Sequence, residues 1–288
     1  MESSYRPTSA DVAVSNASVQ TASWPRTKRR PSQFFFASTM IGLGVLGLIY
    51  GDVAMVWQHI PIDHLPGQTL VAYAIALIEL ACGVGLLFES TASTSAVVLT
   101  VFLLLWVVLL KLPALLVAPA VELSWLGFGE IAVMLAGAWV LLATQRGNTS
   151  DGWLKYIAGE RGMRHARVLF ALSLPMIGLS HFVYSEQTAA FVPAWLPYRL
   201  GWAYLTGAGS IAACLGVLFG VLPRLAATLE AAMLWIITSL VWVPAIVATP
   251  TDRTTWTAFV ISAAIACGAW VVADSYRTAP YAGRAADS

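Results

Sequence analysis

The sequence predicts an all-α, polytopic membrane protein of about eight transmembrane helices, arranged as two parallel four-helix repeats. Composition, segment length and an internal repeat support this prediction. Of the 288 residues, 58% are hydrophobic and only 11% are charged, whereas soluble domains carry about 25% charged residues. We therefore expect the lipid bilayer to be the main partner. The formal net charge of +1 gives no indication of a nucleic-acid partner.

Eight apolar segments follow one another along the chain. Each approaches the roughly 20 residues that a helix needs to cross a bilayer. Helices are expected because backbone groups in hydrocarbon must pair within their own segment, and because the alternating pattern of a membrane barrel is absent. The segments are 34–53, 69–88, 95–118, 124–143, 166–184, 201–221, 224–248 and 255–273.

A shift of 131 residues aligns the two halves of the chain without a gap. Pro113-Ala114 meets Pro244-Ala245, and the run Gly-Ala-Trp-Val at 137–140 recurs at 268–271. Each repeat contains four helices, so both enter the membrane from the same side and the pseudo-twofold axis runs along the membrane normal. The predicted organisation is a disordered cytoplasmic tail (1–33), a first repeat (34–147), a cytoplasmic linker (148–165), a second repeat (166–275) and a C-terminal tail (276–288).

Basic residues predict the orientation of the bundle. All of the 16 Lys and Arg except Lys111, Arg199 and Arg253 fall on the side that holds both termini and the 144–165 loop. The positive-inside rule then places both termini in the cytoplasm.

Small residues spaced four apart predict close helix packing. The cysteines lie in apolar segments, so we expect small buried side chains and no disulfide. The spaced residues are Gly47 and Gly51, Ala81 and Gly85, and Ala212, Gly216 and Gly220, and the cysteines are Cys82, Cys214 and Cys267.

Ionisable residues inside the spans are the main candidates for chemistry, because charges in hydrocarbon are costly. Glu79 lies near the middle of the second helix. Lys111 and Glu130 share a depth of roughly 10 Å on the third and fourth helices, at 1.5 Å per residue. One interpretation is a structural Lys111–Glu130 ion pair that fixes helix register. The other is a polar-ligand or proton site that also includes Glu79, with Tyr50 near its mouth.

The aligned positions in the second repeat are Ser210, Trp242 and Ile261, which favours one composite site in the first repeat. His181 aligns with Tyr50 and is either an interfacial hydrogen-bonding residue or part of a ligand or proton site. Glu230 is expected to form a structural pair with a basic residue.

No recognised motif assigns a catalytic residue, so the catalytic residues stay unknown. The 53–68 loop has Asp52 at its edge and contains His59, Asp63 and His64, but their spacing matches no metal motif, and we expect no metal site.

Residues 178–219 resemble the DoxX family of four-helix membrane proteins. Gly178, His181 and Phe182 match the end of the family's first helix, and Pro193, Trp195 and Pro197 match its loop signature. The family's glutamate in the next helix is Ser210 here, whereas the first repeat keeps it as Glu79. The resemblance covers 166–273 well and 34–143 more loosely, which implies a tandem fusion of two family units.

The resemblance implies a redox-associated protein of the bacterial inner membrane. Such a protein would handle a quinone or quinol, or support a membrane oxidoreductase as its partner. A small-molecule transporter is the alternative suggested by the charges inside the spans, and a non-catalytic scaffold is the third. An oligomer is compatible with the sequence.

Overall fold

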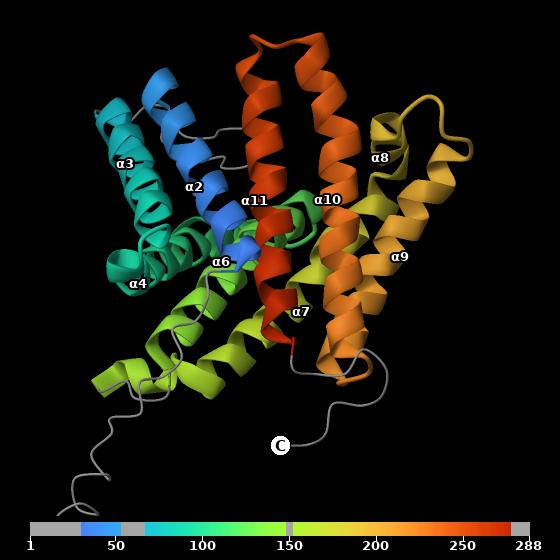
Figure 1. Cartoon of the computed structure of the whole chain (residues 1–288). Helices are drawn as coiled ribbons and strands as arrows, with labels where there is room; N and C mark the ends of the chain where they lie inside the picture. The colour runs from blue at the N-terminus through green and yellow to red at the C-terminus, as the bar shows by residue number, and fades with distance from the viewer. Residues whose placement is uncertain (1–29, 53–66, 148–151, 278–288) are drawn as a thin grey trace, which may run out of the picture. The chain divides into compact units, whose positions relative to one another are not determined.

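The structure is a computed structural model that describes residues 30–52, 67–147 and 152–277. Within those ranges it is an all-α protein (Figure 1), and eight of its helices are long and apolar enough to cross a membrane. The predicted fold class is therefore confirmed. We call the side that holds Pro31 and Ser275 the termini side, and the side that holds Tyr50 and Arg253 the loop side.

The first repeat contributes four spans. They are α2 (Pro31–Tyr50), α3 (Gln68–Leu86), a third span made of α4 (Glu89–Trp106), the π-helix η1 (Val107–Lys111) and α5 (Leu112–Val117), and α6 (Glu122–Arg146).

The second repeat contributes another four. They are α7 (Gly159–Val183), α9 (Arg199–Leu218), α10 (Pro223–Ala248) and α11 (Arg253–Ser275), with the short helices η3 (Gly152–Tyr156) before α7 and α8 (Ser185–Phe191) after it.

Three helix starts differ from the sequence prediction. Helix α7 begins at Gly159, so residues 159–165 of the predicted linker are helical. Its first turns carry Arg161 and Arg164, which favour helix but fall outside an apolar segment. The third span begins at Glu89 rather than at residue 95. Its first residues are rich in Ser and Thr, so hydrophobicity alone placed the start of the span too late. Residues 31–33 of the predicted N-terminal tail belong to α2, whereas 1–29 and 278–288 lie outside the described residues.

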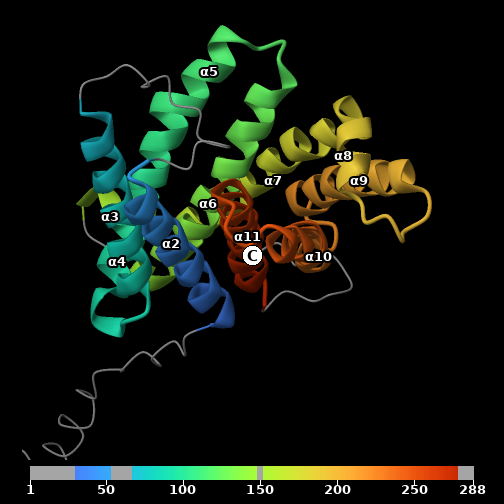
Figure 2. The same ribbon diagram turned by 90° about the horizontal axis from the view of Figure 1, so that it is seen from above.

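The eight spans pack as a closed ring. Within each repeat the helices contact one another in chain order, and the fourth helix then packs on the first helix of the other repeat: α6 on α7, and α11 on α2. Helices α6 and α11 also contact each other across the middle of the ring (Figure 2). Each four-helix bundle is thus closed by a helix from the other repeat.

The crossing of α6 and α11 is the centre of the fold. Gly137 of α6 and Gly268 of α11 occupy aligned positions in the repeats, and a Cβ added to Gly137 would lie 2.7 Å from the Cα of Gly268. Only glycine permits this approach, so the pseudo-twofold axis passes close to this contact. The buried share of the most apolar stretch is 78% in α6 and 72% in α11, against 11% in α10.

The two halves also repeat their local hydrogen bonds. The indole Nε1 of Trp125 donates to the carbonyl of Pro119 at 2.9 Å, and Trp256 donates to Pro250 at 2.8 Å. Both pairs are related by the 131-residue shift. The same sequence pattern therefore builds the same helix start in both repeats.

Several predicted small residues do permit close packing. A Cβ on Gly47 would lie 2.7 Å from the Cβ of Ala76, and one on Gly216 would lie 2.8 Å from the Cβ of Ala226. Gly220 does not fit this interpretation, because it has a φ of +66° and no described neighbour within 4 Å of an added Cβ. Its role is in the turn before α10, so the packing prediction was wrong there. All three cysteines are buried free thiols, as expected.

Candidate functional site

Glu79 is a buried carboxyl group deep inside the first bundle. It lies 11 residues after the start of α3 at Gln68, which corresponds to about 16 Å along the helix. Only 6% of its surface is accessible. An ionised carboxylate at that depth costs about 2.5–3.5 kcal/mol on insertion scales, so its surroundings decide what it can do.

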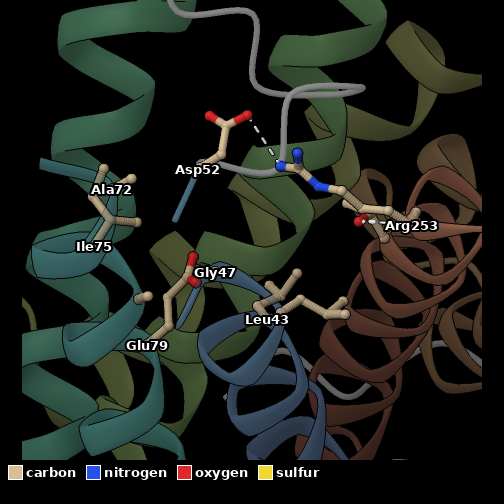
Figure 3. A pocket seen from close by; sticks show the side chains of 10 residues that line it. Leu43, Gly47, Asp52, Ala72, Ile75, Glu79 and Arg253 are labelled. Carbon is tan, nitrogen blue, oxygen red and sulfur yellow. Dashed lines mark hydrogen bonds and ion pairs between the residues drawn. The ribbon is translucent and has the colours of Figure 1, made fainter. Parts of the chain in front are cut away.

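A small pocket joins Glu79 to the loop side (Figure 3). Its cavity volume is about 10 Å³, close to the minimum of about 10–15 Å³ that one water molecule needs. The wall is mainly aliphatic and comes from α2, α3 and the start of α11. The lining residues are Leu43, Leu46, Gly47, Asp52, Ala72, Ile75, Ala76, Glu79, Arg253 and Thr257.

An ion pair covers the loop-side end of this pocket. A guanidinium nitrogen of Arg253 lies 3.1 Å from Oδ2 of Asp52 (Figure 3), and the two side chains are 35% and 23% exposed. The Arg253 guanidinium also lies over the ring of Tyr50, 4.9 Å from its centroid. The second carboxylate oxygen of Asp52, Oδ1, is buried without a hydrogen-bond partner within the described ranges. We call Asp52 and Arg253 the lid pair.

The start of α11 holds Arg253 in place. Asp252 is the N-cap residue, and its carboxylate accepts hydrogen bonds from the backbone N–H groups of Thr254 and Thr255 and from the Thr255 hydroxyl. The bond from the Thr255 hydroxyl, together with the backbone bonds, lowers the pKa of Asp252 below its ordinary value. A charged cap at the helix N-terminus also fits the helix dipole.

Close packing of α2 on α3 keeps the pocket small. A Cβ on Gly44 would lie 2.6 Å from the carbonyl oxygen of Ala76, and Gly47 leaves equally little room beside the same residue. The two helix backbones are therefore in direct contact along the pocket wall. The space beside Glu79 admits a water molecule and excludes larger solutes.

Lys111 and Glu130 form a second charged group in the first repeat. The Lys111 ammonium points at α6, where it lies 3.2 Å from the Cβ position of Gly127, one turn before Glu130. Glu130 is 8% exposed, and its Oε2 is buried without a hydrogen-bond partner among the described residues. A contact of about 4 Å or less between the two charged groups stays a prediction.

The π-helix η1 ends at Lys111, two residues before Pro113. Proline removes a backbone donor and disturbs the preceding turn. However, α10 passes the aligned Pro244 as a continuous α-helix, so proline alone does not explain the π-helix. π-Helical segments inside α-helices are frequently found at functional sites.

The structure groups Glu79 with the lid pair rather than with the other two charges. Neither Lys111 nor Glu130 belongs to the described lining of the Glu79 pocket. Tyr50 lies at the mouth of that pocket through its contact with Arg253. Sequence reasoning missed the lid pair, because Arg253 was used only as evidence for orientation.

His181 lies in the other bundle. Its Nδ1 is 2.7 Å from the Thr206 hydroxyl, which joins α7 to α9. The arrangement is that of an interhelical hydrogen bond, and no titratable group of the Glu79 pocket takes part in it.

The second repeat also contains a buried carboxyl group, Glu230, on a different helix from the residue aligned with Glu79. Glu230 of α10 is 2% exposed, and its Oε1 accepts a hydrogen bond from Ser210 at 2.9 Å. Ser210 is the residue aligned with Glu79, so the second repeat supplies its carboxyl group from the neighbouring helix. The described hydrogen-bond partner of Glu230 is thus Ser210 and not a basic residue, and the bond is consistent with the structural role expected of this carboxyl group. The other aligned residues are structural, since Trp242 donates to the Ser262 hydroxyl at 2.9 Å and Ile261 is buried.

The comparisons with known proteins leave the function open. A family model described as a domain of unknown function (DUF8561) matches residues 170–249. No curated protein and no solved structure matches the chain. The loop residues His59, Asp63 and His64 lie outside the described residues.

Proposed function

We propose that this multi-pass membrane protein binds and releases protons at Glu79, as part of a proton-coupled transporter. The observation that supports the proposal is the Glu79 carboxyl group beside a cavity of about 10 Å³, beneath the lid pair of Asp52 and Arg253. A carboxyl group with one water molecule beside it can exchange a proton. The space is too small for an organic substrate.

Comparison of the two repeats supports the same proposal. Glu230 is buried and hydrogen-bonded to Ser210, so its environment is that of a structural carboxyl group. Within the described residues the Glu79 carboxyl group makes no equivalent hydrogen bond and faces a cavity instead. The cavity, rather than the carboxyl group alone, distinguishes the first bundle.

The direction of exchange follows from the proposed orientation. The positive-inside rule assigns the termini side to the cytoplasm of a cytoplasmic membrane. The lid pair then lies on the outer side, and protons reach Glu79 from there.

A reconstituted system tests this function. The purified protein is placed in liposomes that contain a pH-sensitive dye, and a potassium diffusion potential drives protons inward. We expect Glu79→Gln to abolish the proton flux, because glutamine keeps the size but binds no proton. Glu230→Gln is the matched control and should retain the flux, since that group faces no cavity.

A flux in Glu79→Gln equal to that of the unsubstituted protein would overturn the proposal. If the unsubstituted protein carries no flux, the scaffold interpretation gains support.

A quinol-linked role is the second candidate, and the position of Glu79 favours it. The acid falls in the segment IALIELACGVGLLF, which resembles the DoxX family. Oxidation of a quinol releases two protons and two electrons. In this role one proton would pass to Glu79 by way of water and the other to the surrounding water, while a partner oxidoreductase would take both electrons.

The two candidates make different predictions for the purified protein. A quinol-linked protein should retain quinone after extraction in mild detergent, detectable by mass spectrometry, and should carry no proton flux without a quinol and an electron acceptor. A proton-coupled transporter should show flux in liposomes that contain no quinone.

A further inference from the structure

A second, much larger pocket lies on the termini side, in the groove between α2 and α10 over the end of α11. Its cavity volume is about 830 Å³, within the range of about 300–1,000 Å³ that is usual for ligand pockets. It is distinct from the Glu79 pocket and has no lining residue in common with it. The lining residues are Phe35, Arg224, Thr228, Ala231, Ala232, Trp235, Trp270, Ala273, Asp274 and Arg277.

The lining combines aromatic walls with a positive charge. Phe35 stacks on Trp270 with 5.6 Å between the ring centroids and meets Trp235 edge to face at 6.2 Å. Two arginines and one aspartate line the pocket, so the lining residues carry a net positive formal charge. Such a lining suits a ligand with an anionic group beside apolar chains.

Hydrogen-bond donors remain available for that anionic group. Asp274 accepts from Nε of Arg277 at 2.9 Å and from the Ser32 hydroxyl, which leaves the Nη groups of Arg277 for another acceptor. The indole N–H of Trp235 is buried and has no acceptor in the described part of the chain. A buried donor without an acceptor is costly, and Trp235 carries such a donor within the lining of this pocket.

The repeat provides an internal comparison. The equivalent groove lies between α7 and α4 over the end of α6, where Trp139 is aligned with Trp270. There the chain covers the groove itself: the indole of Trp139 donates to the carbonyl of Ile157 at 2.8 Å, just after η3. In the second groove Trp270 lies in the same lining as Arg224. The residue aligned with Arg224 in the first repeat is Ser93, which carries no charge. The Trp139 N–H is therefore satisfied within the chain, whereas the second groove contains Arg224 and the Trp235 N–H, which has no acceptor in the described part of the chain.

We propose that this groove binds the headgroup of an anionic phospholipid. The location supports a lipid rather than a soluble anion, because α10 is the least buried span and its exposed Leu229 and Ile236 continue the groove along the apolar surface. Basic pockets between helices on the cytoplasmic side are typical anionic-lipid sites. The acyl chains would lie along α10 while the phosphate contacts Arg224, Arg277 and Trp235.

Retention of lipid by the full-length protein tests the proposal. The protein is reconstituted in phosphatidylcholine with or without phosphatidylglycerol, released in mild detergent, and examined by native mass spectrometry and thermal unfolding. We expect bound phosphatidylglycerol and a higher melting temperature. Replacing both Arg224 and Arg277 by Gln should weaken retention about thirtyfold, at about 1 kcal/mol for each charge. Trp235→Phe removes the N–H donor together with one ring of the indole and should also weaken retention.

Arg164→Gln is the matched control, because it removes an exposed charge from the same side but outside the pocket. An equal loss in this control would show non-specific attraction and overturn the proposal. Equal stabilisation by inorganic phosphate would identify a soluble anion, and displacement by a neutral quinone at lower concentration would identify a different ligand. If phosphatidylglycerol binds only after residues 278–288 are deleted, the C-terminal segment is the occupant and the proposal fails.

Discussion

Replacing Gly137 by alanine places a methyl group where α6 crosses α11. The new Cβ would lie 2.7 Å from the Cα of Gly268 and 3.0 Å from its carbonyl oxygen. These neighbours are backbone atoms and cannot rotate away. The helices must therefore separate by roughly 1 Å, which weakens the packing of the two most buried spans.

The expected magnitude is a balance of two effects. Overpacking a close contact costs about 1–3 kcal/mol, whereas alanine stabilises a helix relative to glycine by up to about 1 kcal/mol. We expect Gly137→Ala to lower the free energy of unfolding by about 1–2 kcal/mol. The free energy can be measured by titration from mild detergent into sodium dodecyl sulfate, followed by circular dichroism.

Gly201→Ala is the matched control. Gly201 lies in the first turn of α9, and its nearest neighbour to an added Cβ is 3.7 Å away, an ordinary contact distance. The variant should be as stable as the unsubstituted protein or more stable, by up to about 1 kcal/mol. If Gly137→Ala is equally stable, α6 and α11 do not cross in direct backbone contact, and the central crossing of the fold is wrong.

Three other predictions follow from the charged groups and the topology. If Lys111 and Glu130 form a buried ion pair, Lys111→Met and Glu130→Gln should each lower the free energy of unfolding by about 3–5 kcal/mol. The double variant should then lose less than the sum of the two single losses. Additive losses would contradict the pair. The cap at Asp252 should stabilise the protein fully above about pH 4, because its pKa is lowered in the folded state, and this contribution should disappear as the pH falls further. Asp252→Asn keeps the cap and should flatten the acid side of the stability–pH curve; an unchanged curve would contradict this role. Reporter fusions should place the 53–68 and 185–200 loops outside and the 144–165 loop inside, and a periplasmic C-terminus would overturn the orientation.

The spans were predictable because hydrophobicity and length are properties of single segments. Their packing was not, since a lipid-facing side chain and a helix-facing side chain can both be apolar. The 131-residue shift aligned Gly137 with Gly268, but an alignment shows which residues correspond, not which residues touch. The contact of α6 with α7, and of α11 with α2, therefore required the structure.

The candidate site was predictable only in part. Glu79 was found because a carboxyl group inside a span is costly. Its lid pair was not found, because Asp52 and Arg253 are 201 residues apart in sequence and each is an ordinary residue at the end of a span. Glu230 was named from the sequence, but its hydrogen bond to Ser210 was not predicted. A signal did exist, because Ser210 stands at the place of Glu79 and a carboxyl group on a neighbouring helix could have been sought beside it.

Infrared spectroscopy of the reconstituted protein tests the role of Glu79 most directly. A protonated carboxyl group has a C=O stretching band that shifts when its proton is replaced by deuterium. Transfer to heavy water should shift a band that is absent in Glu79→Gln, and the shift should appear rapidly because the pocket admits water. The band of Glu230, identified with Glu230→Gln, should exchange much more slowly. If the Glu79 band is absent, or exchanges no faster than that of Glu230, the carboxyl group is not in proton exchange with the loop side.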